Sequence, residues 1–321
     1  MANPGLNRRQ VLAGALMGAA SLTWQRRARA GAPGGAYPAA AAGSVRIGED
    51  LVVNRLGFGA MRITGPGIWG EPKDTREARG VLRRAVELGV NFIDTADAYG
   101  PAVSERLIAE ALHPYAHGLV IATKGGLERP GQSEWTRNGR PEHLRAACGD
   151  SLRRLKLERI DLYQLHAIDP KVPLEESLGE LARLRQEGKI RHVGVSNFKL
   201  DELVRARRIV PVVSVQNRYN VVDRVSADVL EYCSRERIAF IPWAPLARGE
   251  NQTLTAKDSG KALESIAAAR RVTVMQLAIA WLLAKSPQML PIPGTSSVAH
   301  LEEDVAAAAI KLSPKELAAI G

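Results

Sequence analysis

The sequence is poor in cysteine, in aromatic residues and in metal-ligand patterns. Its 321 residues contain two cysteines, Cys148 and Cys233, and only 5% aromatic side chains. Two cysteines in so long a chain exclude a disulfide framework, and because both lie in helix-like segments we expect buried free thiols. Neither cysteine has a cysteine or histidine beside it at ligand spacing, and the six histidines form no such pattern either. We therefore predict no metal site.

A basic stripe is also lacking, although the formal net charge is +10. Five arginines fall in the first 30 residues, where no acidic residue occurs. Without that segment, 39 basic residues stand against 34 acidic ones, a modest surplus that is typical of a solvated surface. We therefore predict no nucleic-acid partner. A composition of 45% hydrophobic and 24% charged residues suits one large globular domain.

The first 30 residues have the pattern of an export signal. Arg8 and Arg9 precede an apolar run from Val11 to Trp24, and Ala28 and Ala30 form a small-x-small cleavage site. The run is shorter than the about 20 apolar residues of a membrane-spanning helix. We predict a twin-arginine signal at 1–30 that is recognised by the twin-arginine export machinery, and hence a periplasmic protein. The alternative is an uncleaved anchor or a basic tail, with a cytoplasmic protein if the signal is not used.

Residues 31–43, "GAPGGAYPAAAAG", are rich in glycine, proline and alanine and have no periodic apolar face. We interpret them as a linker. The remaining chain, 44–321, is predicted to be one catalytic domain, and we expect a monomer.

From residue 44 onward, short apolar runs alternate with amphipathic segments. This alternation predicts an α/β fold with a parallel sheet, and eight such units over roughly 250 residues favour a closed (β/α)8 TIM barrel. The segment 44–53, "SVRIGEDLVV", resembles a β-hairpin, which we expect to close the floor of the barrel. The predicted strands are "LGFGAM" at 56, "NFIDTA" at 91, "LVIATK" at 119, "DLYQLH" at 161, "HVGVSN" at 192, "VVSVQN" at 212, "AFIPWAP" at 239 and "MLPIPGT" at 289.

A dinucleotide-binding doubly wound domain is the rival fold. It requires G-x-G-x-x-G between the first strand and the first helix. Here Gly57 and Gly59 are followed by Arg62 at the third required position, so the pattern fails.

Four ionisable side chains follow three consecutive predicted strands. Asp94 ends the second strand, with Tyr99 in the next loop, Lys124 ends the third and His166 ends the fourth. Because the carboxyl ends of barrel strands meet at one mouth, we expect these groups to converge and form a catalytic site.

These residues carry a resemblance to the aldo-keto reductases. It covers the chain from about 45 to 321 and rests on several motifs in the family's order and spacing. They are "GVNFIDTADAYG", "SERLIAEAL", "IATKGG", "DLYQLHAIDP", "HVGVSNF", "VQNRYN", "PWAPLA" and "PIPGTSS".

The resemblance implies an NAD(P)H-dependent oxidoreductase that reduces an aldehyde or ketone. Tyr99 would be the general acid, and the ammonium of Lys124 would lower its pKa from the usual value near 10. Asp94 would hold Lys124, and His166 would orient the substrate carbonyl. Asp97 has no matching role and is interpreted as a structural loop residue.

The resemblance also implies a nicotinamide dinucleotide across the barrel mouth. NADP(H) is favoured, and NAD(H) is the alternative because lysine and arginine are absent where many relatives bind the 2'-phosphate. The hydroxyls of Thr295 and Ser296, with His300, would engage that phosphate, whereas Asp304 would repel it. The residues expected at the cofactor are Ser196, Asn197, Gln216, Trp243, Leu246, Arg248, Gly294, Thr295, Ser296, His300 and Asp304.

The substrate is expected to be a small carbonyl compound with an apolar or aromatic body, because Trp69, Trp135 and Tyr219 lie in segments predicted as pocket loops. A second function stays open at this point. The chain would then be a nicotinamide-binding regulatory or redox-sensing module with little turnover.

Overall fold

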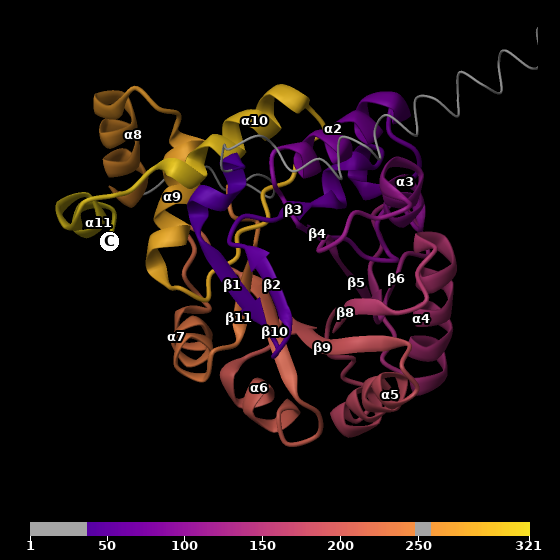
Figure 1. Ribbon diagram of the computed structural model, residues 1–321. Coiled ribbons are helices and arrows are strands. Elements are labelled where there is room, and N and C mark those ends of the chain that lie inside the picture. Colours follow the sequence, from indigo (N-terminus) through magenta and orange to yellow (C-terminus); the bar gives the residue numbers. More distant parts are fainter. Residues whose placement is uncertain (1–36, 248–257) are drawn as a thin grey trace, which may run out of the picture. The chain divides into compact units, whose positions relative to one another are not determined.

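The computed structural model describes residues 37–247 and 258–321 of the chain. In these residues, seven strands form one curled sheet in the order β11-β10-β9-β8-β5-β4-β3, with every neighbouring pair parallel. Figure 1 shows the helices around the outside of this sheet. The strands are β3 (Phe58–Gly59), β4 (Phe92–Asp94), β5 (Val120–Gly125), β8 (Ile160–Leu165), β9 (Ile190–Ser196), β10 (Val212–Arg218) and β11 (Ala239–Trp243).

The helices follow the predicted periodicity. In α2 (Thr75–Glu87), buried positions recur three or four residues apart, and the carboxylate of Asp74 accepts from the first free backbone N–H groups. The other α-helices are α3 (Val103–Leu112), α4 (Pro141–Leu155), α5 (Leu174–Gln186), α6 (Leu200–Ala206), α7 (Ala227–Glu236), α8 (Asp258–Arg270), α9 (Val274–Lys285), α10 (Val298–Ala306) and α11 (Pro314–Ile320). Four short 3-10 helices are η1 (Pro38–Ala42), η2 (Ala60–Ile63), η3 (Pro66–Ile68) and η4 (Ala307–Ala309).

The segment predicted as an eighth strand, at 289–295, is not a regular strand. Pro291 and Pro293 lack the backbone N–H that a ladder needs, so only an isolated bridge joins Met289 to Phe240 of β11. The proline carbonyls still accept, at 2.9 Å from Gly57 N and at 3.2 Å from Gly59 N beside β3. This segment therefore hydrogen-bonds to both outer edges of the sheet.

Glycine is required where this segment crosses β3. A Cβ on Gly294 would lie 2.4 Å from the carbonyl oxygen of Gly59, and a Cβ on Gly59 would lie 2.7 Å from that of Ile292. Both contacts are with backbone atoms that have no freedom to move away, so a side chain at either position would force the two segments apart.

The hairpin predicted at 44–53 is present over residues 44–54, with β1 (Ser44–Ile47) and β2 (Leu51–Asn54) paired antiparallel. The turn uses Gly48 with φ at 64°, a conformation that favours glycine. The buried hairpin side chains share a cluster with residues that begin sheet strands. This cluster includes Val45, Ile47, Leu51, Val53, Phe92, Val120, Ala239 and Leu290.

Two further hairpin contacts involve charged groups. Asp50 in the turn accepts from His192 Nε2 at 2.6 Å and also from Arg191, both of β9.

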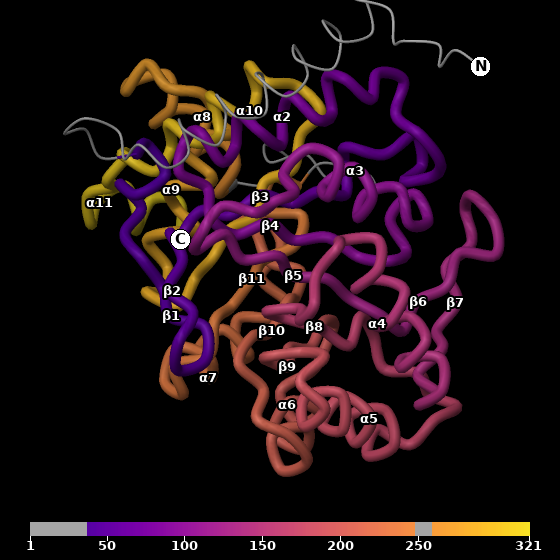
Figure 2. The backbone as a smooth tube through the Cα atoms, turned by 45° about the vertical axis from the view of Figure 1, so that its right-hand side comes forward, coloured from indigo at the N-terminus to yellow at the C-terminus, as the bar shows by residue number. Residues whose placement is uncertain are grey.

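Beyond the main sheet, β6 (Leu127–Glu128) pairs with β7 (Thr136–Arg137), and Figure 2 shows this second hairpin beside α4.

The predicted linker at 31–43 is wrong for its second half. Residues 38–42 form η1, and Ala39 and Ala42 are buried in the core because their small side chains fit closely. Ala39 N donates to Leu88 O at 3.0 Å. The folded unit thus begins at Tyr37 instead of residue 44. The predicted signal at 1–30 and residues 31–36 of the linker lie outside the described residues.

Both cysteines are free and buried, as predicted, and burial raises the pKa of each thiol to about 12. In the described part of the chain no single helix is long and apolar enough to cross a membrane, although one sharply bent pair, Ser259–Arg270 with Val274–Lys285, passes by length and composition.

Candidate active site

The four predicted catalytic side chains meet at the carboxyl ends of neighbouring strands. Asp94 is the last residue of β4, Lys124 lies near the end of β5, and His166 directly follows β8. Lys124 Nζ donates to Asp94 Oδ2 at 2.6 Å, to Thr95 O at 2.8 Å and to Tyr99 Oη at 3.3 Å. The structure thus brings together the residues that the sequence placed on separate strands.

Two glutamines hold the other oxygen of Asp94. Gln164 Nε2 donates to Asp94 Oδ1 at 3.0 Å, and Gln216 Nε2 donates to the same oxygen at 2.8 Å. The carboxylate therefore accepts three buried hydrogen bonds and cannot rotate without breaking them. Gln164, a fully buried residue of β8, was not predicted from the sequence.

Burial and the neighbouring charges have opposite effects on the pKa values of Lys124 and Tyr99. Burial lowers the pKa of Lys124, but the charge and hydrogen bond of Asp94, with a smaller effect from Tyr99, outweigh burial and raise the pKa above its usual value. Burial raises the pKa of Tyr99, and the Lys124 ammonium offsets only part of this rise. The Lys124 ammonium thus lowers the Tyr99 pKa in the expected direction, but desolvation of a phenolate in this enclosed site is the larger effect and leaves the pKa above its usual value.

His166 is neutral at physiological pH. Burial and the nearby Lys124 ammonium both lower its pKa well below the usual 6.5. Its ring meets that of Tyr99 edge-on at 5.8 Å between centroids. Its Nδ1 is buried without a hydrogen-bond partner in the described structure, so the imidazole has an unused hydrogen-bonding atom next to the tyrosine.

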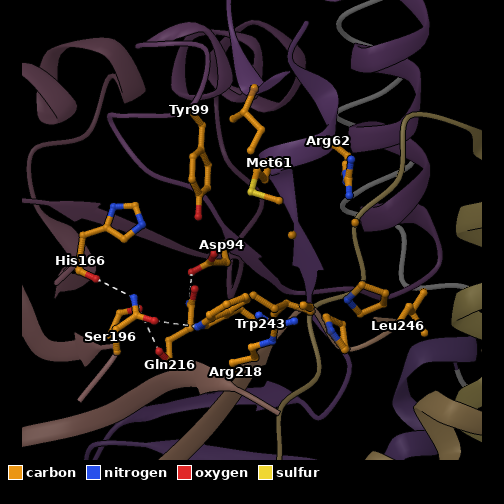
Figure 3. A pocket seen from close by; sticks show the side chains of 18 of the residues that line it. Met61, Arg62, Asp94, Tyr99, His166, Ser196, Gln216, Arg218, Trp243 and Leu246 are labelled. Atoms are coloured by element: carbon orange, nitrogen blue, oxygen red, sulfur yellow. Dashed lines mark hydrogen bonds between the residues drawn. The ribbon is translucent and has the colours of Figure 1, made fainter. Parts of the chain in front are cut away.

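A cavity of about 450 Å³ opens beside these groups (Figure 3). Tyr99 and His166 lie on one side of it, and Trp243 and Leu246 on the other. The remaining lining residues are Gly59, Met61, Arg62, Ile68, Asp94, Trp135, Ser196, Asn197, Gln216, Arg218, Ala244, Pro245, Ile292, Pro293 and Gly294.

Hydrogen bonds between lining residues fix one wall of the cavity. Trp243 Nε1 donates to Asn197 Oδ1 at 3.0 Å, and Asn197 Nδ2 donates to His166 O at 3.1 Å. Ser196 Oγ donates to Gln216 O at 2.9 Å. The indole of Trp243 is thus tied to the strand ends that carry the polar groups.

Arg218 extends this wall. Its guanidinium carbon lies 5.2 Å from the centre of the Trp243 ring, and Nε is 2.9 Å from Asp223 Oδ2. Some lining residues were not predicted from the sequence, among them Arg218, Met61, Arg62 and Ile68. The alternation along β10 carried a signal for Arg218, because Gln216 and Arg218 are two residues apart and face the same side.

The predicted cofactor residues divide into two groups. Ser196, Asn197, Gln216, Trp243, Leu246 and Gly294 all line the cavity. Thr295, Ser296, His300 and Asp304 do not. Among these four, Thr295 and Asp304 are buried, whereas Ser296 and His300 are exposed. Arg248 lies outside the described residues.

Only one of the three predicted substrate residues lines the cavity. This residue is Trp135, whose ring centre is 6.5 Å from that of His166. Trp69 lies beside Arg129 instead, with 5.4 Å between its ring centre and the guanidinium carbon. Tyr219 is a core residue, 2% exposed and stacked on Trp281 of α9 at 5.9 Å, because it lies at the end of β10 and faces the helices.

A curled parallel sheet with ionisable side chains gathered at its carboxyl rim is the arrangement found in enzymes of the (β/α)8 barrel class. The family model described as "Aldo/keto reductase family" matches residues 55–321. The chain belongs to this family.

Relatives agree with this assignment. The chain is 52% identical over 283 residues to an uncharacterized oxidoreductase of Schizosaccharomyces pombe, covering 88% of this chain and 90% of that protein. It is 42% identical over 274 residues to pyridoxine 4-dehydrogenase of Escherichia coli, covering 84% and 94%.

Solved structures show the same fold. The glycerol dehydrogenase of Gluconobacter oxydans matches with a TM-score of 0.77 and 28% identity, over 87% of this chain and 94% of that one. An aldo/keto reductase of Klebsiella pneumoniae in complex with NADP and acetate matches with a TM-score of 0.72 and 27% identity, over 86% and 93%. Such neighbours support a nicotinamide cofactor, with NADP favoured.

Proposed function

We propose that this protein is an NAD(P)H-dependent carbonyl reductase in which Tyr99 is the general acid. The observation that carries the proposal is the 3.3 Å hydrogen bond from Lys124 Nζ to Tyr99 Oη at the edge of the cavity, with Asp94 fixing the lysine. A phenol in this position has a proton to donate and a cation beside it to stabilise the phenolate that remains.

Each neighbouring side chain has a distinct task. The raised pKa of Tyr99 keeps the phenol protonated before reaction, and the Lys124 ammonium stabilises the phenolate afterwards. Asp94, held by Gln164 and Gln216, prevents Lys124 from moving away. Neutral His166 presents a hydrogen-bonding edge that would orient the carbonyl oxygen toward Tyr99.

The cavity fits a nicotinamide cofactor by its chemistry. Trp243 offers a flat face, Ser196, Asn197 and Gln216 offer amide and hydroxyl groups, and Arg218 adds a positive charge. These residues would hold the nicotinamide end, and Leu246 and Gly294 would lie further along. When bound, the cofactor supplies the hydride. We propose NADP(H) as the preferred form and NAD(H) as the alternative.

The test is oxidation of NADPH and NADH by the full chain, followed by absorbance, beside Tyr99→Phe. Because a relative is named pyridoxine 4-dehydrogenase, the carbonyl panel includes pyridoxal with other aromatic and aliphatic aldehydes. We expect multiple turnovers that fall by about 10²- to 10⁴-fold in the variant. Cofactor binding without turnover, unchanged by Tyr99→Phe, would reject the reductase and favour the regulatory or redox-sensing module.

We propose further that residues 1–30 direct export to the periplasm by the twin-arginine route, that the protein is a monomer, and that the hairpin 44–54 closes the barrel floor. Cell fractionation of the full chain beside the double variant Arg8→Lys, Arg9→Lys tests the first point. Cytoplasmic retention of both proteins would contradict export.

A further inference from the structure

Arg129 is a buried cation that lies behind the cavity wall. Its side chain belongs to the segment between β6 and β7, and only 8% of the residue is exposed. The guanidinium donates to Glu134 O at 3.0 Å and to Gln132 O, which are carbonyls of its own loop. Among the described residues, no carboxylate forms an ion pair with Arg129, so backbone carbonyls and the faces of two tryptophan rings, Trp69 and Trp135, solvate this charge.

The same guanidinium reaches two other loops. It donates to Ile68 O at 2.9 Å and Gly67 O at 3.2 Å in the η3 loop, and to Ala98 O at 3.5 Å next to Tyr99. One planar side chain therefore joins the loop before α2, the loop after β4 and the β6–β7 hairpin. Each of these loops contributes a residue to the cavity, namely Ile68, Tyr99 and Trp135.

Stacking fixes the orientation of Trp135. The guanidinium carbon lies 3.9 Å from the centre of the Trp135 ring, within the range of a strong cation–π contact. Trp135 is otherwise weakly held, since 40% of it is exposed. Its ring lies edge-on to that of His166, which lies edge-on to that of Tyr99. A continuous row of aromatic rings thus runs from Arg129 to the proposed acid.

Two more contacts fasten the same loops. Gln132 Nε2 donates to Pro66 O at 3.1 Å, and Gly70 N donates to Gly100 O at 3.0 Å. These contacts hold the loops near each other without orienting Trp135. The orientation of that ring depends on the planar face of Arg129, which the compact ammonium of a lysine does not provide.

We propose that Arg129 is a positioning residue that sets the substrate-side wall, Ile68 and Trp135, and so gives the site its preference for flat aromatic carbonyls over small aliphatic ones. This inference rests on the proposed reductase function. Arg129 touches neither substrate nor cofactor and acts by holding Trp135 against His166, where an aromatic ring would pack.

The test compares Arg129→Met and Arg129→Lys with the full wild-type chain. Arg129→Met is expected to lower kcat/KM for pyridoxal about tenfold more than for propanal, mostly through KM. Arg129→Lys keeps the charge but not the planar face, and it is expected to restore little. Arg153→Met, an exposed arginine of α4, serves as the matched control with wild-type kinetics.

A double-mutant cycle with Trp135→Leu identifies the route of the effect. If Arg129 acts through Trp135, the double variant loses no more aromatic preference than Trp135→Leu alone. Additive losses would overturn the proposal, as would an equal fall for pyridoxal and propanal or no fall for either.

A binding readout separates this proposal from the proposed function. Quenching of tryptophan fluorescence by pyridoxal reports binding to the full chain without any turnover. If wild type turns over no carbonyl yet binds pyridoxal about tenfold more tightly than Arg129→Met, the reductase assignment fails while the role of Arg129 stands. Equal affinities would overturn that role.

Discussion

Asp94 and Lys124 form an ion pair at 2.6 Å in which the two side chains are 3% and 1% exposed. Taking both charges out of water is costly, and the pair is compensated by the three further hydrogen bonds from Lys124, Gln164 and Gln216 to their partners. The site is thus a network in which each charge depends on the others.

Asp94→Asn is expected to destabilise the protein strongly. The ammonium of Lys124 would remain buried without its anion, and burial would then lower the pKa of Lys124 against only the smaller effect of Tyr99. We expect the free energy of unfolding to fall by about 3–5 kcal/mol in urea denaturation. Glu175→Gln, which breaks the exposed pair with Arg205, is the control and is expected to change stability little. Similar losses in both variants would contradict this view of the site.

Asp97 is expected to make stability depend on pH. Its Oδ1 is enclosed without a hydrogen-bond partner in the described structure, and burial, with the nearby charge of Glu105, raises its pKa from 3.8 to about 8. The unfolded chain loses this proton near pH 4 and the folded chain only near pH 8. The contribution of protonated Asp97 to the free energy of unfolding is therefore lost as pH rises through this window.

Asp97→Asn removes that dependence, because an amide does not titrate. The unfolding free energy of the variant relative to wild type is expected to increase from pH 5 to pH 9 in urea denaturation. A difference that stays constant over this range would show that Asp97 is ionised in the folded protein.

Tyr219 and Trp135 are expected to respond in opposite ways to substitution by leucine. Tyr219 packs between Trp281 and Phe240, so Tyr219→Leu should lower the free energy of unfolding by about 2–4 kcal/mol and leave the KM for a small aldehyde unchanged. Trp135→Leu should raise KM for an aromatic aldehyde and leave stability nearly unchanged. A changed KM in Tyr219→Leu would show instead that Tyr219 contributes to the substrate pocket.

His300→Arg is expected to favour NADPH. His300 is exposed on α10, and an arginine there would add a fixed charge and two parallel donors for a phosphate. Fluorescence titration should show an increase of about tenfold in the NADPH to NADH affinity ratio. His117→Arg, an exposed histidine after α3, is the control. An unchanged ratio would place the 2'-phosphate away from α10.

The positions of the proposed catalytic residues were predictable because they depend on topology. Three of them, Asp94, Lys124 and His166, lie at the carboxyl ends of neighbouring parallel strands. Such ends meet at one rim of the sheet, and the conformation of the loops does not change this. Gln164 was not predicted, although the alternation along its strand indicates its direction. Gln164 lies two residues before His166, so both side chains face the same side. A polar residue on the inner face of a buried strand requires a partner, and here that partner is Asp94.

Loop side chains were less predictable because their direction depends on partners distant in sequence. Trp69 and Trp135 are both tryptophans of rim loops, yet only Trp135 lines the cavity. The guanidinium of Arg129 lies over both rings, and its hydrogen bonds end on backbone carbonyls, which leave no residue pattern to detect. The effect of burial on the Tyr99 pKa was not predictable for a similar reason, because the extent of burial is a property of the folded site.

The segment 289–295, which hydrogen-bonds to both edges of the sheet, affects the order in which the protein can fold. Arg55, just before β3, hydrogen-bonds to Met289 O, 234 positions later, and also to Leu283 O and Ser286 O. Until residues 283–293 have been synthesised, the first edge of the sheet, at β3, lacks these partners. Closure of the sheet therefore depends on contacts between residues far apart in sequence, which form slowly and leave this edge exposed in the meantime.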